Sequence, residues 1–157
     1  MAQAHILSVL ALAGAIGCGS STTTGQAKTF NVTLAVANET PPCTQAGANA
    51  TGTATVTVSA DNTTITVNAT YSGLSGPATA AHIHYGTPAA SGPVVLPFAQ
   101  PLTSPVSETL TAANYVAATG APADFPTFVT ALRAGGAAYI NFHTAACPPG
   151  EIRAELQ

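Results

Sequence analysis

Charged residues are scarce in this chain of 157 residues: three are Lys or Arg and six are Asp or Glu, which is 6% in all. An ordinary globular domain has about 25% charged residues. Three cations cannot neutralise many phosphates, so the sequence excludes a protein that holds nucleic acid by electrostatics. The same scarcity of cations argues against a basic segment that binds a membrane surface.

The sequence also lacks the short motifs of several large enzyme classes. It contains no nucleophile elbow, phosphate-binding loop, dinucleotide-binding fingerprint or H-E-x-x-H helix. Serines in the predicted loops, such as Ser72, Ser75 and Ser91, have no recognisable base beside them. We therefore predict no catalytic residues and favour a non-enzymatic protein.

An apolar run near the amino terminus, Ile6–Ile16, is too short to cross a bilayer, which takes about 20 residues. Its length is typical of the core of a secretory signal peptide. The following Gly17 and Cys18 resemble the end of a bacterial lipobox, in which the cysteine becomes lipidated. We predict a signal peptide over 1–17, lipid attachment at Cys18 and a flexible tether over 18–27. Ordinary cleavage nearby, with Cys18 lost or left as a spare thiol, is the alternative.

Only two further cysteines follow, Cys43 and Cys147. In an exported chain two thiols in one domain usually pair, because the compartment is oxidising. A disulfide between them would close a long loop and stabilise the fold by about 4–5 kcal/mol in the chain-entropy model. Two free, buried cysteines are the alternative.

Alternation of apolar and polar residues indicates a chain made mostly of β-strands. Asp61 and Asn62 mark a tight turn between two strands that are apolar on one face and rich in threonine on the other. We expect the threonine face to lie in water. The fold class is an antiparallel β-sandwich or barrel, similar to an immunoglobulin or a Cu/Zn superoxide dismutase domain. The predicted strands are 30–36, 54–58, 65–71, 80–85, 94–96, 106–110, 139–143 and 152–156.

One segment has the spacing of a helix. Phe125, Phe128, Val129 and Leu132 fall at i, i+3, i+4 and i+7, which places them on one helical face. Asp124 is the predicted N-cap, Pro126 lies in the first turn and Gly135 is the predicted stop. We expect this helix to cover an opening between strands, and a second short helix over 111–118.

Three of the four histidines fall in two predicted strands. Alternation places His82 and His84 on one face of their strand, and His143 on the same face of its strand as Tyr139 and Asn141. If these faces meet, three imidazoles converge in a set that suits copper or zinc. The alternative is that each imidazole only forms hydrogen bonds that order the fold. Glu151 and Arg153 share the outer face of the last strand and could pair with each other or with a neighbouring strand. The simpler expectation is a surface ion pair of little weight, while a buried arginine would matter more.

Three segments together resemble the CHRD domain family: A-H-I-H-Y-G at 81–86, Y-I-N-F-H-T at 139–144 and P-G-E-I-R-A-E-L at 149–156. The resemblance covers 28–157, which we predict to be the folded domain. Cys147, Pro149 and Ala154 depart from the family pattern, which has Asn, Gly and Gly there, so a disulfide through Cys147 looks like a local elaboration. The residues that match the family motif are His82, His84, Gly86, Asn141, His143, Thr144, Gly150, Glu151 and Arg153.

The resemblance implies an exported, β-rich domain, since chordin carries such domains outside the cell and bacterial secreted proteins and lipoproteins often have one. We expect a monomeric, non-enzymatic module anchored by lipid in the bacterial outer membrane, periplasm or cell surface, or otherwise secreted. Its partner would be a protein or another envelope component. A Cu- or Zn-binding, superoxide dismutase-like protein is the second hypothesis, although the other dismutase ligands and its arginine loop are not recognisable. A purely structural surface protein with no cofactor is the third.

Overall fold

The fold is mainly β, as the alternation predicts. The computed structural model describes Met1 and residues 25–157. The strands are β1 (Lys28–Ala35), β2 (Thr51–Val58), β3 (Ile65–Ser72), β4 (Ala78–Tyr85), β5 (Val94–Pro97), β6 (Val106–Leu110), β7 (Ala138–Thr144) and β8 (Ile152–Glu155). The predicted signal peptide and Cys18 lie outside the described residues.

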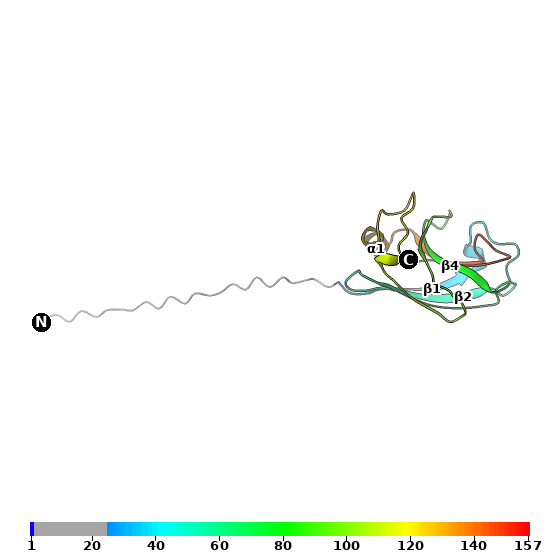
Figure 1. Cartoon of the computed structure of the whole chain (residues 1–157), viewed down its shortest axis with the longest axis horizontal. Helices are drawn as coiled ribbons and strands as arrows, with labels where there is room; N and C mark the ends of the chain where they lie inside the picture. The colour runs from blue at the N-terminus through cyan, green and yellow to red at the C-terminus, as the bar shows by residue number, and fades with distance from the viewer. Residues whose placement is uncertain (2–24) are drawn as a thin grey trace.

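The eight strands form one antiparallel sheet in the order β5-β4-β7-β8-β1-β2-β3-β6. The sheet curls into a nearly closed, barrel-like body (Figure 1). Strands β1 and β8 pair at a single position, Ala35 with Arg153, so the sheet is weakly joined there. The other neighbours pair over longer ladders, such as the eight positions that join β1 to β2. The predicted sandwich or barrel is confirmed.

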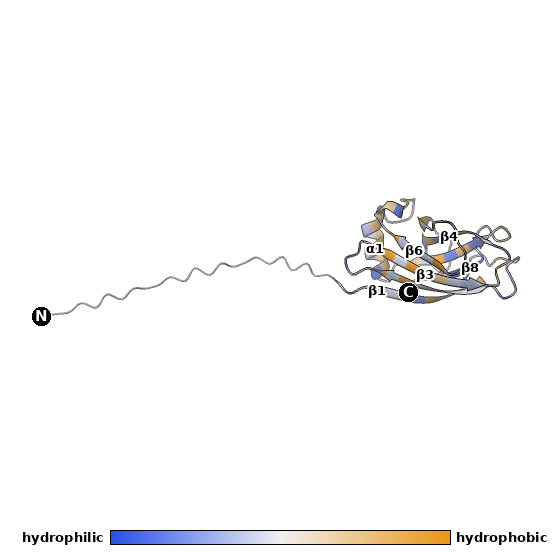
Figure 2. Ribbon diagram, turned by 60° about the horizontal axis from the view of Figure 1, so that its bottom comes forward, coloured by the Kyte–Doolittle hydropathy of each residue, from blue (hydrophilic) through white to orange (hydrophobic). Residues whose placement is uncertain are grey.

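Apolar side chains from alternate positions fill the inside of the sheet. Val56, Val67, Ile83 and Ile140 have no exposed surface, and Phe142 lies among them. In Figure 2, strands such as β3 carry both hydrophobic and hydrophilic residues along their length. Alternation puts neighbouring residues on opposite faces, so one continuous core forms from residues that are distant in sequence.

The predicted helix is present as α1 (Phe125–Arg133). The Asp124 side chain accepts a hydrogen bond from the Thr127 amide, as an N-cap should. Its buried residues are the predicted four, and the Phe128 ring lies against Tyr85 of β4. The second predicted helix shrinks to a single 3-10 turn, Ala112–Asn114, capped by Thr111. Another such turn follows β1 at Val36–Asn38. None of the described helices is long and apolar enough to cross a membrane.

The predicted disulfide is also confirmed. Cys43 and Cys147 are bonded, with their Cα atoms 5.8 Å apart and a sequence separation of 104. The bond ties the long β1–β2 connection, residues 36–50, to the loop between β7 and β8. This connection therefore lies over the outer face of β7 and β8, which is the face that carries the candidate site.

Candidate functional site

The three strand histidines meet on the outer face of β4 and β7. These strands are antiparallel neighbours, and the register sets His82 opposite Asn141 and His84 opposite Tyr139. One nitrogen from each of His82, His84 and His143 lies within 4.8 Å of the others. The closest pair is His82 Nδ1 and His143 Nε2, at 3.0 Å. The structure thus brings together the imidazoles that the strand alternation places on one side.

Backbone carbonyls fix which nitrogen of each buried imidazole carries hydrogen. The Nδ1 atom of His84 lies 2.8 Å from Gly92 O, and that of His143 lies 2.8 Å from Pro148 O. A carbonyl can only accept, so both Nδ1 atoms donate and both Nε2 atoms of the neutral rings carry a lone pair. The Nε2 atom of His84 is buried and has no hydrogen-bond partner.

All three imidazoles are held neutral near pH 7. The pKa of His82 is lowered to about 4, first by burial and then by the repulsion that a charged ring would feel from His143 and His84. Burial likewise lowers the pKa values of His84 and His143, against hydrogen bonds to Gly92 and Pro148 that act to raise them. A neutral imidazole is the form that binds metals.

A buried arginine lies beside the histidine cluster. The Tyr139 ring stacks on His84 with 4.6 Å between ring centres, and the guanidinium carbon of Arg153 lies 3.3 Å from the centre of the Tyr139 ring. Arg153 has no exposed surface and pairs with Glu155 at 2.7 Å. It also donates to the carbonyls of Thr87 and Ala90, so it holds the loop that follows β4 against the sheet.

The expected surface pair of Glu151 and Arg153 is therefore wrong. Both residues are fully buried, because the loops fold over this face, and Arg153 pairs with Glu155 instead. Glu151 lies just before β8 and accepts hydrogen bonds from the amides of Gly47 and Ser75 and from the hydroxyl of Thr144. Burial alone would raise the pKa of Glu151, but these hydrogen bonds lower it overall.

A second buried carboxyl, Glu39, reaches the site from the connection between β1 and β2. It is 5% exposed, and burial raises its pKa to about 7, against the hydrogen bond from Asn141 and the charge of Arg153, which act to lower it. The Asn141 amide nitrogen lies 3.4 Å from Glu39 Oε1. Gly150 has a φ of +138° and faces the Glu39 carboxylate so closely that any side chain there would collide with it. The family glycine at 150 is thus required by backbone conformation and by space.

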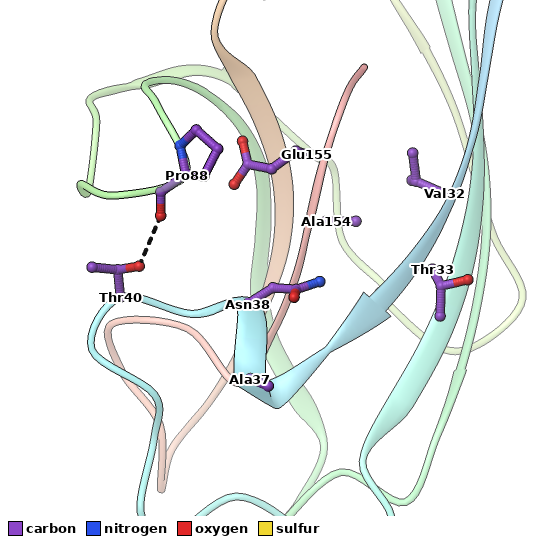
Figure 3. Close-up of a pocket in the computed structure, with 8 residues that line it drawn as sticks. All are labelled: Val32, Thr33, Ala37, Asn38, Thr40, Pro88, Ala154 and Glu155. Atoms are coloured by element: carbon purple, nitrogen blue, oxygen red, sulfur yellow. Dashed lines mark hydrogen bonds between the residues drawn. The ribbon is translucent and has the colours of Figure 1, made fainter.

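A cleft of about 420 Å³ opens where β1 and β8 part after their single pair (Figure 3). Val32 and Thr33 of β1 line one side, and Ala154 and Glu155 of β8 line the other. One oxygen of Glu155 pairs with Arg153, while the other is buried and has no hydrogen-bond partner.

The rim of this cleft joins two loops. The Thr40 hydroxyl donates to the Pro88 carbonyl at 3.1 Å, and the Ser91 hydroxyl donates to the Thr40 carbonyl at 3.0 Å. These bonds tie the β1–β2 connection to the loop after β4, so that both loops cover the histidine face together.

Sequence reasoning missed Glu39, Glu155 and Gly92 as parts of this site. Glu39 and Gly92 lie in loops, where no periodicity indicates which way a residue faces. Glu155 follows Arg153 at i+2 on one strand, and this spacing could have indicated the pair that forms.

The comparisons with known proteins agree with the sequence motifs. The family model of the CHRD domain matches residues 30–156 and so includes all three histidines of the cluster, the buried Arg153 and both disulfide cysteines. No curated protein and no solved structure matches the chain. Because the match spans far more than half of its length, the chain belongs to the CHRD domain family, a family of extracellular, secreted-type domains.

Proposed function

We propose that this protein is an exported, lipid-anchored CHRD module that binds a partner protein at the bacterial envelope and catalyses no reaction. The disulfide between Cys43 and Cys147 carries the proposal. Such bonds persist in oxidising compartments and are rare in the cytosol. The apolar run Ile6–Ile16 and the following Cys18 supply an export signal and a lipid attachment point.

The cleft between β1 and β8 is the surface we assign to the partner. Its volume of about 420 Å³ lies within the range of sites that hold small groups or a few side chains. Strand edges form its walls, and an extended segment of a partner can bind along such edges through main-chain hydrogen bonds. The Glu155 carboxylate would select a hydrogen-bond donor or a basic side chain there.

Export can be tested through the state of the cysteines in cells. Thiols are trapped by alkylation during lysis, and the modified peptides are identified by mass spectrometry. We expect Cys43 and Cys147 to be disulfide-bonded and protected from alkylation. Alkylation of both at high yield would place the protein in a reducing compartment and refute export.

The anchor is tested with Cys18→Ala. We expect this variant to lose incorporation of a labelled fatty acid and to move from the membrane fraction to the soluble fraction. Membrane fractionation without a lipid label in the parent protein would refute the anchor, while leaving export intact.

The binding surface is tested by placing a photo-crosslinking amino acid at Thr33, on the exposed rim of the cleft, and at Asn68, on the exposed face of β3. We expect crosslinks to one discrete protein from position 33 and none from position 68. Equal crosslinking from both positions, or none from either, would favour a structural surface protein.

A further inference from the structure

We propose that His82, His84 and His143 form a site for one copper or zinc ion. The proposal is independent of the partner and the anchor, since it rests on the histidines of β4 and β7 and the groups that contact them. One nitrogen of each imidazole lies within 4.8 Å of the other two. In a tetrahedral zinc site the bonds are about 2.0–2.1 Å, so ligand nitrogens lie roughly 3.3 Å apart. Small side-chain rotations would close the remaining gap.

The two buried imidazoles are already oriented as metal ligands usually are. Metal-binding histidines almost always donate their other N–H to a carbonyl or carboxylate, which fixes the tautomer and the direction of the ring. His84 does this with Gly92 O and His143 does it with Pro148 O, each at 2.8 Å. The Nε2 lone pair of His84 is therefore left for a ligand, while that of His143 faces His82 Nδ1 at 3.0 Å, a contact that a bound metal ion would replace.

The space between the imidazoles holds acceptors without enough donors. The Nε2 atom of His84 is buried without a partner. The Nε2 atom of His143 lies 3.0 Å from Asn141 Oδ1, and neither atom carries a hydrogen when His143 is neutral and donates through Nδ1. Buried polar atoms without partners are rare in folded proteins and costly. The Nδ1 hydrogen of His82, 3.0 Å from His143 Nε2, could serve that nitrogen alone, whereas a cation here would be coordinated by the Nε2 atoms of both His84 and His143.

In the described part of the chain, no lysine or arginine side chain places a positive charge against these nitrogen atoms. Arg153 lies nearby, but its N–H groups go to Glu155 and to the carbonyls of Thr87 and Ala90. A bound metal ion would supply the positive charge that these nitrogen lone pairs face.

The donor set selects the class of metal. Three imidazoles suit copper, zinc or nickel, and affinities for nitrogen sites are highest near copper and zinc. Magnesium and calcium prefer oxygen ligands, and the histidine cluster includes no carboxylate. Three protein ligands also leave a coordination position open, as in catalytic rather than structural zinc sites. His82 is half-buried, while His84 and His143 are buried, so the open position would face solvent beside His82.

The experiment uses the mature chain purified without a histidine tag. Metal is removed with a chelator, Zn²⁺ and Cu²⁺ are added in separate samples, and bound metal is measured after dialysis. We expect about one equivalent of metal per chain for at least one of the two ions. Bound Cu²⁺ should also show nitrogen couplings in its electron paramagnetic resonance spectrum.

His82→Gln is the main variant, because His82 is the least buried of the three and its loss should least disturb the fold. We expect at least a tenfold loss of affinity, with an unchanged circular dichroism spectrum in the metal-free protein. Asn68→Ala, on the far side of the sheet, is the matched control and should keep the full metal content. Less than about 0.1 equivalent of both ions in folded parent protein would overturn the site, and so would undiminished binding by folded His82→Gln.

Discussion

The sheet has two outer faces that look alike in sequence and differ in environment. On β1–β3 the outer residues are threonines and asparagines in water, where hydroxyls pair sideways, as Thr53 does with Thr70 at 3.0 Å. On β4, β7 and β8 the outer residues are polar too, yet loops cover them and Arg153 has no exposed surface. Both faces obey the same alternation, so the strand pattern does not distinguish them. The loops that cross one face and leave the other open make the difference.

Coverage changes what each polar group contributes to stability. An exposed hydroxyl that loses its partner finds water, so a pair such as Thr29 with Thr57 adds little. When a covered polar group loses its hydrogen-bond partner, no water can take the partner's place. The group then stays buried without a hydrogen bond, which destabilises the folded state. The covered face should therefore respond strongly to substitutions that the open face tolerates.

The largest expected effect is that of Arg153→Met. This substitution keeps the length of the side chain but leaves Glu155 without its ion pair and the carbonyls of Thr87 and Ala90 without their donors. Removing one partner of a buried ion pair typically costs about 3–5 kcal/mol. Urea unfolding followed by circular dichroism measures the change in the free energy of unfolding.

Lys28→Met on β1 is the matched control. It also removes one positive charge from a strand, but Lys28 is exposed, so we expect a change below about 1 kcal/mol. Similar losses in the two variants would mean that coverage does not distinguish the faces.

The next largest expected effect is the contribution of Glu39 to the pH dependence of the free energy of unfolding. Its pKa is raised from 4.5 to about 7 in the folded protein. Between these values the unfolded chain has lost this proton while the folded chain retains it, so the contribution of Glu39 to stability falls as pH rises through this window. Glu39→Gln keeps the shape and the acceptor for Asn141 and removes the titration.

We therefore expect the free energy of unfolding of Glu39→Gln, relative to that of the parent protein, to rise by about 3 kcal/mol between pH 4 and pH 8. This follows from the pKa shift of Glu39 at about 1.4 kcal/mol per pKa unit. The histidines are present in both proteins, so their opposite dependence cancels in the difference. The measurement is the difference in unfolding free energy at several pH values. A flat difference across this range would show that Glu39 is not buried as described.

The smallest expected effect is that of removing a threonine hydroxyl, which can be compared between the open face and the covered region. Thr53→Val, on the open face, should change the unfolding free energy by less than about 1 kcal/mol. Thr144→Val, in the covered region, removes a hydroxyl that donates to buried Glu151, and we expect a loss of about 1–3 kcal/mol. Thermal or urea unfolding of both variants measures the contrast, which would vanish if Glu151 were reached by water.

Much of the fold follows from local patterns. Every predicted strand and the helix at Phe125–Arg133 are present, because period-two alternation and an N-cap report directly on local geometry. The short helix predicted over 111–118 reduces to one turn, since an alanine-rich stretch with no apolar periodicity gains nothing from packing as a longer helix. The single pairing of β1 with β8, which opens the cleft, has no local signal.

The sequence by itself determined that His82 and His84 point to one side and that Tyr139, Asn141 and His143 share a side. It also determined that Cys43 and Cys147 were the two thiols within the predicted domain. Only the tertiary structure decided that these sides coincide, that loops bury them, and that Arg153 pairs with Glu155. The reason is physical: the direction of a side chain is set by its own backbone, whereas its burial depends on which distant segments pack above it. That packing sets the pKa of Glu39 and leaves the Nε2 lone pair of His84 without a hydrogen-bond partner.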